Sequence, residues 1–202
     1  MLNDFTNGQI KQYPSLLMHV DGGCEPRNPG GTACSAWVIY ADKKIIAQEH
    51  KVVQKGGEKA TNNFAEYCAL GLGLRWLDDQ KWRGELHIKG DSKLLVEQVH
   101  RRWQCKAKNL IPLRERIFQL LACLELTLFD PELVTFTCHS CNHVGGIDTI
   151  IETGKDQLCP KCHTRNWMAN NPESGNCRLE WVPREQNSYA DELTNIAYRE
   201  SR

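Results

Sequence analysis

The sequence has no surplus of charge of either sign, no long apolar run and no repeated or low-complexity segment. Its 202 residues include 25 Lys and Arg and 25 Asp and Glu, so no overall basic field marks it as a nucleic-acid-binding protein, although local patches are compatible with a neutral mean. The first residues, MLNDFTNGQIKQYPS, lack the basic start and apolar stretch of a secretion signal. We therefore expect a soluble, cytoplasmic protein with no membrane partner.

Cysteine, by contrast, is frequent, and four of the ten cysteines share a metal-binding spacing. Cys138, Cys141, Cys159 and Cys162 form C-x2-C-x17-C-x2-C, in which two tight turns can place four thiolates around one tetrahedral ion. Thiolates favour zinc, so we predict one structural Zn²⁺. The other six cysteines are interpreted as core residues or free thiols, and the nearby histidines as surface residues: Cys24, Cys34, Cys68, Cys105, Cys123 and Cys177, and His139, His143 and His163.

Strand and helix patterns alternate along the rest of the chain, as in an α/β domain. Strands are predicted in SLLMHVDGG, CSAWVIYAD, KIIAQEHKVV, GELHIKGDS and LEWVPRE. Helices are predicted in NNFAEYCALGLGLRWL, SKLLVEQV and LIPLRERIFQLLACL, and after the last strand. The short Asp-Lys-Lys turn between the second and third strands indicates an antiparallel start. In the first helix, Gly71 and Gly73 are expected to allow close packing on the sheet.

The last strand follows the preceding helix only after about fifty residues, far more than a usual connection. The four paired cysteines lie inside this interval. A metal-clamped ribbon explains how such a segment can be ordered without a large core of its own. We therefore predict a discontinuous main domain of residues 1–131 and 173–202, with a zinc ribbon inserted at 132–172.

Carboxylates stand at the ends of predicted strands or at the starts of helices in four places: Asp21, Glu66, Asp91 and Asp191. If gathered together they repel one another unless divalent cations bind, and oxygen ligands suit Mg²⁺. Taken singly, three have another interpretation, because Asn63-x-x-Glu66 and Ser188-x-x-Asp191 fit capping boxes and Asp91 stands at an N-cap position. Asp21 ends a strand, has no helix to cap and precedes two glycines that let a ligand approach.

The strings around these acids resemble, in order and placement, the motifs of type 1 ribonuclease H, especially its archaeal and short bacterial forms: DGGCEPRNPGG, TNNFAEY, IKGDSKLLV and WVPREQNSYAD. KAKNLIPL is similar to the same subgroup, and the resemblance covers about residues 16–200 apart from the insert. It implies an α/β fold with a five-stranded mixed sheet flanked by helices. The implied activity is an endonuclease that cuts the RNA strand of RNA/DNA hybrids, leaving 3′-OH and 5′-phosphate ends.

The same resemblance implies that the four acids hold two Mg²⁺ or Mn²⁺ ions, about 4 Å apart in two-metal phosphoryl chemistry. It assigns Asp21 to both ions, Asp191 to the ion that activates water, and Glu66 and Asp91 mainly to the other. Hard and soft ligands should segregate the metals, so zinc is expected only at the cysteines.

The resemblance also implies contacts to the hybrid from Gly22, Gly23 and Asn28 after the first strand, from Asn62 and Asn63, and from a DNA-phosphate pocket of Lys59, Thr61 and Asn109. Short amides suit the 2′-hydroxyl that distinguishes RNA. Helix capping is an equal alternative for the Asn pair, and an ordinary polar loop is the alternative for the phosphate pocket. One more segment is interpreted as a basic patch for the duplex backbone, with a solvated surface turn as the alternative. It comprises Arg101, Arg102, Trp103, Lys106 and Lys108.

One position departs from the pattern of many type 1 enzymes, which carry a histidine on the loop before the last acid. VPREQNSYAD has no histidine, and Arg184 is interpreted as its replacement, as in the archaeal subgroup. An arginine can contact phosphate but is a poor proton carrier, because it stays charged. A surface ion pair with Glu185 or another acid is the alternative. Whether double-stranded RNA is also a substrate stays open.

The ribbon has three candidate roles: a wider nucleic-acid footprint through Lys155, Lys161, Arg165 and Trp167, protein docking, and a structural clip. We expect a monomer. The alternative functions are a zinc-ribbon nucleic-acid-binding protein that uses a ribonuclease H-like scaffold without cutting, the detached domain of a reverse-transcription machine, and a DNA nuclease of the same broad fold. Intact acids argue against the first, and the TNN string argues against the last.

Overall fold

The computed structural model of the protein describes residues 9–129, 135–146, 150–153, 156–170 and 175–202. The chain divides into two compact units. The larger unit comprises Met1–Leu128 and Asn176–Arg202, and the smaller unit comprises Phe129–Gly175. The predicted domain boundaries, at 131/132 and 172/173, lie outside the described residues.

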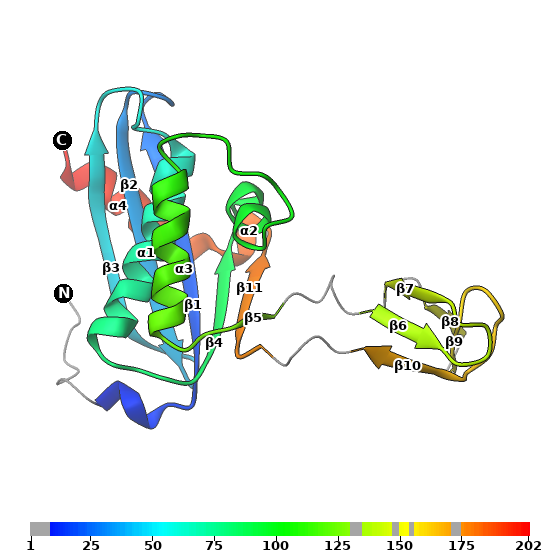
Figure 1. The fold of residues 1–202 in the computed structure, drawn as a ribbon. Coiled ribbons are helices and arrows are strands. Elements are labelled where there is room, and N and C mark those ends of the chain that lie inside the picture. The colour runs from blue at the N-terminus through cyan, green and yellow to red at the C-terminus, as the bar shows by residue number, and fades with distance from the viewer. Residues whose placement is uncertain (1–8, 130–134, 147–149, 154–155, 171–174) are drawn as a thin grey trace. The chain divides into compact units, whose positions relative to one another are not determined.

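A six-stranded mixed sheet forms the centre of the larger unit (Figure 1). In sheet order its strands are β3 (Lys44–Lys55), β2 (Thr32–Ala41), β1 (Ser15–Glu25), β4 (Glu85–Gly90), β11 (Cys177–Trp181) and β5 (Leu128–Phe129), whose second residue is the first of the smaller unit. The pairs β1–β2 and β2–β3 are antiparallel, whereas β4 is parallel to both β1 and β11. The five predicted strands and the mixed sheet are confirmed. The two-residue edge strand β5 is additional, being too short to show a periodic pattern.

Helices cover both faces of this sheet (Figure 1). On one face α1 (Asn62–Asp79) packs on β1 and β2, and α3 (Ile111–Cys123) packs on α1. On the other face α4 (Ser188–Glu200) packs on β1, β2 and β3. The short α2 (Lys93–Val99) directly follows β4, and the 3-10 helices η1 (Gln9–Gln12) and η4 (Arg184–Gln186) precede β1 and α4. The last strand was predicted to extend through LEWVPRE, and this end is wrong, because β11 stops at Trp181. Pro183 follows shortly after and has no N–H to continue the ladder.

The β2–β3 hairpin follows from its two turn residues. Asp42 and Lys43 have φ values of 48° and 66°, and Ala41 pairs with Lys44. Positive φ at both central residues matches the right-handed twist of the flanking strands. The predicted antiparallel start is therefore confirmed.

The apolar core lies between the sheet and α1 with α3, and it includes the fully buried Trp37, Tyr67 and Trp82. The two glycines of α1 differ within this packing. A Cβ on Gly73 would lie 2.4 Å from Met18 Sδ on β1, whereas a Cβ on Gly71 would meet nothing within 4 Å. Close packing was therefore predicted correctly for Gly73 and wrongly for Gly71, which faces outward.

The smaller unit is built from short strands: β6 (Thr135–Cys138), β7 (Val144–Gly146), β8 (Ile151–Thr153), β9 (Asp156–Leu158) and β10 (Trp167–Asn170). They form a three-stranded sheet in the order β10-β6-β7 and a separate β8–β9 hairpin. Its small core contains Phe136, Cys138 and Cys159. Within the described parts of both units, no helix is long and apolar enough to cross a bilayer.

Candidate active site

Parallel pairing of β1 and β4 brings two acids from distant sequence positions together. The last parallel pair is Val20 with Gly90, and Asp21 and Asp91 follow directly on the two strands. The sequence predicted that Asp21 ends its strand. This is wrong, because β1 continues to Glu25 in its pairing with β2. Asp21 marks the end of the parallel pairing only.

Glu66 reaches the same point from α1, which lies directly on β1. A Cβ on Gly22 would lie 2.2 Å from the backbone N of Glu66, so only glycine permits this approach. The Gly22 N–H in turn hydrogen-bonds the Glu66 carboxylate. Carboxylate oxygens of Asp21, Glu66 and Asp91 consequently all lie within 4.8 Å of one another.

Asp191 stands in the first turn of α4, beside this group of three. It lines the same cavity of about 300 Å³ as the other three acids, but it is outside the 4.8 Å group. Its Oδ1 accepts a hydrogen bond from Arg184, and its Oδ2 lies 3.3 Å from Asn195 Nδ2. The structure thus places all four predicted acids and Arg184 around one cavity.

The helix N-termini have other caps than these acids. Thr61 Oγ1 caps α1 by accepting from Phe64 N, and Ser92 Oγ caps α2 by accepting from Leu95 N. Asn187 precedes α4 and makes no side-chain cap hydrogen bond. The capping interpretations of Glu66, Asp91 and Asp191, and that of the Asn pair, are therefore wrong.

Burial and mutual repulsion set the ionisation of the acids. Asp21 is 5% exposed and Glu66 is 7% exposed. Burial, with a further contribution from Asp91 and Asp191, raises the pKa of Asp21 to about 7. Burial first, and then the neighbouring Asp21 and Asp91, hold the pKa of Glu66 well above its ordinary value. Without a positive partner, the site disfavours its own negative charge.

One carboxylate oxygen at the centre has no protein partner. Glu66 Oε2 is buried and accepts no hydrogen bond from any residue that the structure describes. A buried unpaired oxygen is costly unless a cation satisfies it. The donor set of hard carboxylate oxygens, the repulsion and this open oxygen all fit Mg²⁺ or Mn²⁺.

Two polar residues at the site escaped sequence reasoning. Asn187, which is 1% exposed, donates from Nδ2 to Asp91 Oδ1 and to Val20 O, both at 2.8 Å. His19, two residues before Asp21, lies 3.1 Å through Nδ1 from Asn187 Oδ1. In the sequence, Asn187 lies inside the string WVPREQNSYAD and His19 inside the predicted strand SLLMHVDGG, and neither place distinguishes them from neighbouring polar residues.

The residues predicted to contact substrate fall into two groups. Gly22, Gly23, Asn62 and Asn63 line the cavity with the acids. Asn28 accepts a hydrogen bond from the backbone N of Asn62 at the start of α1.

The three residues of the predicted phosphate pocket are not among those that line the cavity. Lys59 is exposed in the loop before α1. Thr61 uses its hydroxyl as the cap of that helix. Asn109 lies in the turn before α3.

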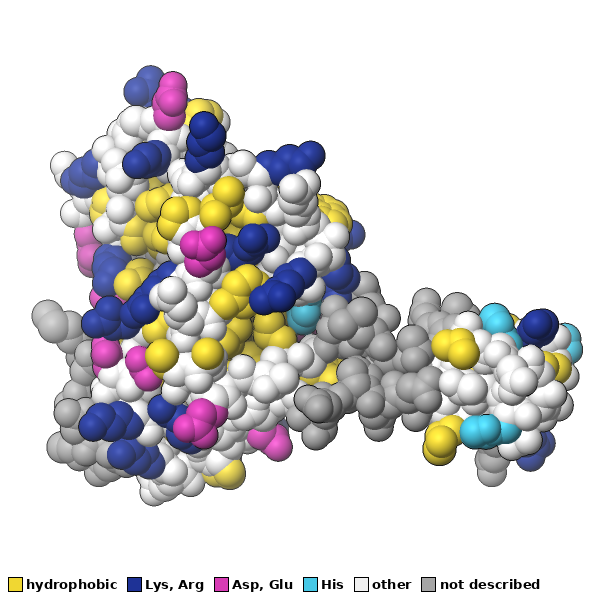
Figure 2. Space-filling view, viewed as in Figure 1, with side chains coloured by type: hydrophobic (Ala, Val, Ile, Leu, Met, Phe, Trp, Pro, Cys, Tyr) yellow, Lys and Arg dark blue, Asp and Glu magenta, His cyan; other side chains and the backbone are white. Residues whose placement is uncertain are grey.

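The predicted basic patch is partly engaged within the protein. Arg101 lies over the Phe118 ring at 4.6 Å, and Arg102 pairs with Glu97 at 2.7 Å, while Trp103 is 46% exposed. On the face of the larger unit seen in Figure 2, Lys and Arg side chains are spread between apolar and acidic ones. Lys106 and Lys108 are exposed.

The four paired cysteines of the smaller unit form a compact sulfur cluster. Their Sγ atoms all lie within 4.8 Å of one another, with Cys138 to Cys162 at 3.5 Å and Cys141 to Cys159 at 3.8 Å. Four sulfurs bound tetrahedrally at about 2.3 Å from zinc are about 3.8 Å apart. All four are free thiols, so the cluster fits a Zn²⁺ ion.

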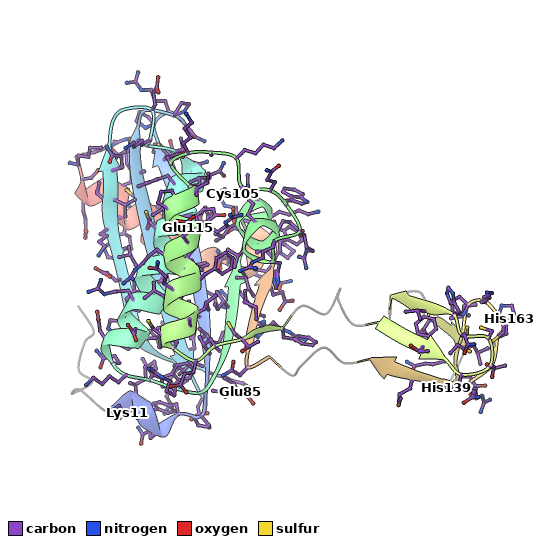
Figure 3. The ribbon with its side chains drawn as sticks, in the orientation of Figure 1. Lys11, Glu85, Cys105, Glu115, His139 and His163 are labelled. Carbon is purple, nitrogen blue, oxygen red and sulfur yellow. The ribbon has the colours of Figure 1, made fainter. Side chains whose placement is uncertain are left out.

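Two of the three histidines beside these cysteines are exposed, as predicted, and the third, His143, is partly buried. His139 and His163 are exposed and lie on different sides of the smaller unit (Figure 3). His143 packs edge-on against Phe136, with ring centroids 5.6 Å apart. The four thiolates are therefore the ligand set that the described residues offer.

Sequence comparison relates the chain to ribonuclease H domains. A family described as "Reverse transcriptase-like" matches residues 19–144. "Bifunctional protein Rv2228c" of Mycobacterium tuberculosis is 40% identical over 100 residues, covering 48% of this chain and 26% of that protein. "Ribonuclease HI" of Halobacterium salinarum is 30% identical over 123 residues, covering 59% of this chain and 55% of that protein. The chain thus spans only about a quarter of the mycobacterial relative's length.

Solved structures show the same fold. The N-terminal RNase H domain of Rv2228c from M. tuberculosis has a TM-score of 0.57 at 24% identity, covering 91% of this chain and 92% of that chain. RNase H1 of H. salinarum has a TM-score of 0.59 at 22% identity, covering 92% and 98%. LC11-RNase H1 in complex with RNA/DNA hybrid has a TM-score of 0.60 at 20% identity, covering 92% and 98%. The chain therefore belongs to the reverse transcriptase-like family of ribonuclease H-like domains and is homologous to type 1 ribonucleases H.

Proposed function

We propose that this protein is a metal-dependent endonuclease that hydrolyses the RNA strand of RNA/DNA hybrids and leaves 3′-OH and 5′-phosphate ends. The observation that carries the proposal is the convergence of Asp21, Glu66 and Asp91 within 4.8 Å, with Glu66 Oε2 buried and unpaired. A duplex-binding scaffold without catalysis would have no need to maintain three mutually repelling acids at one point.

Asp21, Glu66, Asp91 and Asp191 would hold two Mg²⁺ or Mn²⁺ ions. When bound, such ions supply an activated water and neutralise charge on the leaving oxygen of an in-line displacement. The residues of this chain fix the coordination. Asp21 is held in β1 and Glu66 is held against Gly22, while Asp91 is fixed by Asn187. Asp191 on α4 would complete the set from the opposite face of the sheet.

Arg184 would act at the edge of this centre. Its side chain is 70% exposed and pairs with Asp191, which is 25% exposed. An exposed guanidinium can exchange one anionic partner for another and can contact a substrate phosphate in two places. It would position phosphate rather than carry protons, because its pKa, raised further by Asp191, keeps it charged.

Recognition of the RNA strand would come from groups beside the acids. Asn62 and Asn63 present amides to the cavity, and the backbones of Gly22 and Gly23 leave room for a sugar. Amides can both donate to and accept from a 2′-hydroxyl. The roles of Asn28, Lys59, Thr61 and Asn109 in the hybrid footprint stay predictions, as do activity on double-stranded RNA, a monomeric state and a cytoplasmic location.

The smaller unit would bind one structural Zn²⁺ through Cys138, Cys141, Cys159 and Cys162. The ion would cross-link the two cysteine turns and so stabilise the smaller unit, because the small core of this unit cannot stabilise the fold alone. The spacing of the sulfur atoms supports this assignment. Cleavage would not require the zinc, since thiolate ligands and the carboxylate centre stand in separate units.

Cleavage of an end-labelled RNA/DNA hybrid with Mg²⁺ tests the proposed activity. Asp91→Asn should lower kcat on the order of a hundredfold or more, because it removes a charge needed at the ion site. The matched control is Asp79→Asn, which removes an exposed acid at the end of α1 that pairs with Arg75 on the same helix. Equal cleavage by wild type and Asp91→Asn would exclude the site, and tight binding with no cleavage by wild type would favour the scaffold alternative.

A further inference from the structure

A buried amide connects three elements behind the acid cluster. Asn187, before α4, bonds Val20 O on β1 and Asp91 Oδ1 after β4 through its Nδ2, and it meets His19 on β1 through its Oδ1. It makes no cap hydrogen bond to α4, so helix capping does not account for its burial. Among the residues that the structure describes, the side-chain hydrogen bonds of Asn187 go to Asp91 and to the two groups that hold the amide in place, Val20 O and His19.

The orientation of this amide is determined by its neighbours. Val20 O and Asp91 Oδ1 are both acceptors, so both protons of Asn187 Nδ2 are used. A flipped amide would set its oxygen against two other oxygens at 2.8 Å. Oδ1 must therefore face His19, and the His19 ring must donate from Nδ1. The neutral ring with its proton on Nδ1 and the imidazolium both satisfy this, so the contact does not depend on the charge of His19.

We propose that His19 and Asn187 are positioning residues that hold the Asp91 carboxylate toward the divalent ions. This inference rests on the function proposed for the acid site and goes beyond it by assigning a chain of two residues to the setting of one ligand. Asp91 is repelled by Asp21 and Glu66, and rotation of its carboxylate away from them would relieve that repulsion. The N–H of Asn187 opposes the rotation by a charge-assisted hydrogen bond.

The backbone of Asp91 is held independently of His19 and Asn187. Trp181 Nε1 donates to Asp91 O at 3.0 Å, so loss of the His19 contact should release the side chain without displacing the strand end. The groups around His19 compete little with the Asn187 amide for the ring N–H. The Tyr40 ring packs edge-on against it at 5.6 Å, and Lys89 and His87 lie on the same side of the sheet.

A set of three variants separates positioning from packing. His19→Leu keeps the approximate volume and removes the donor, whereas His19→Asn restores an N–H near the position of Nδ1. His87→Leu is the matched control, because His87 lies on the neighbouring strand and pairs with Glu180 at 2.7 Å, away from the acids. Thermal unfolding of each variant shows whether the fold is retained.

Binding of Mn²⁺ to the protein without nucleic acid, measured by calorimetry, is the primary readout. We expect His19→Leu to weaken this binding about tenfold, the usual effect of removing a partner behind a metal ligand. His19→Asn should recover most of the affinity, and His87→Leu should match wild type. In hybrid cleavage, His19→Leu should lower kcat and leave KM unchanged.

Unchanged Mn²⁺ affinity in a folded His19→Leu protein would overturn the proposal, as would an equal loss in His87→Leu or no recovery in His19→Asn. Failure of the proposed function looks different. Wild type would then leave the hybrid uncut, while the comparison of Mn²⁺ affinities among the variants would still report on His19 and Asn187.

Discussion

Asp21 shows at the scale of single residues how function and stability oppose each other in this site. Its carboxylate is buried beside two other acids, and only a cation would make its charge favourable there. Position, rather than residue type, produces this effect. Asp79 on α1 is also an aspartate, but it is exposed and forms an ordinary ion pair with Arg75.

The raised pKa of Asp21 predicts the pH dependence of stability in the absence of divalent ions. Because the carboxyl has a pKa of about 7 in the folded protein and about 3.8 as its ordinary value, the folded state binds more protons between these values. The contribution of Asp21 to the free energy of unfolding therefore falls as pH rises from about 4 to about 7. Asp21→Asn should unfold at nearly the same temperature as wild type at pH 4. At pH 8 it should be more stable by at most about 4 kcal/mol.

Thermal unfolding in chelator at the two pH values measures this difference. Added Mg²⁺ should raise the unfolding temperature of wild type at pH 8 more than that of Asp21→Asn, because the variant has lost a ligand. An Asp21→Asn protein less stable than wild type at pH 8 without metal would contradict the prediction.

Close packing of α1 on β1 is the feature at the scale of elements that sets the site. Gly22 lets the helix backbone approach the strand beside Asp21, and Gly73 does the same two turns farther along, against Met18. Glu66 is aimed at Asp21 because the helix is held at this short distance. Helical periodicity identified α1 but could not show which glycine faced the strand.

Gly73→Ala and Gly71→Ala make a matched pair within one helix. The new methyl on Gly73 would overlap Met18 Sδ, so we expect a loss of about 1 to 3 kcal/mol in the free energy of unfolding. The methyl on Gly71 meets nothing, so the higher helix propensity of alanine should stabilise the protein by up to about 1 kcal/mol. Urea unfolding measures both, and equal effects at the two positions would show that the packing at Gly73 is not limiting.

The whole molecule has two units with separate cores. The large apolar cluster lies within the sheet and helices of one unit, and Phe136 with the buried cysteines forms the other. Each unit should therefore respond to its own metal. The four acids lie on β1, on α1, directly after β4 and on α4, all within the larger unit.

Cys159→Ser tests this independence. Removal of one buried thiolate should abolish stoichiometric zinc, measured by metal analysis, because three ligands do not close a structural site. Cleavage of a short hybrid by the larger unit should be unchanged. Cys123→Ser, at an exposed cysteine of α3, is the control and should retain zinc. Loss of short-hybrid cleavage together with zinc would contradict the independence of the two units.

The role of the smaller unit can be tested with long hybrids. Of the residues predicted for a nucleic-acid footprint, Lys161 and Arg165 are exposed, Arg165 pairs with Asp156, Trp167 begins β10, and Lys155 lies outside the described residues. If the unit extends the footprint, deletion of Phe129–Gly175 should weaken binding to long hybrids more than to short ones. Equal affinity would favour a clip or a protein-docking surface.

The sequence by itself determined the α/β alternation, the paired cysteines and the four acids, since hydrophobic periodicity and motif spacing are local properties. It also supported the resemblance that the family match and the fold confirm. Local patterns could not separate a cap from a ligand. Glu66 and Asp91 were distinguished from helix caps only when Thr61 and Ser92 were seen to occupy those positions.

Only the tertiary structure decided what lies behind the acids. The parallel register of β1 and β4 sets Asp21 beside Asp91, and the return of the chain into α4 buries Asn187 between them and His19. These contacts join positions up to 168 residues apart along the chain. No local pattern encodes such a contact, because a polar side chain acquires its partner, its burial and its pKa only when distant strands and helices pack together.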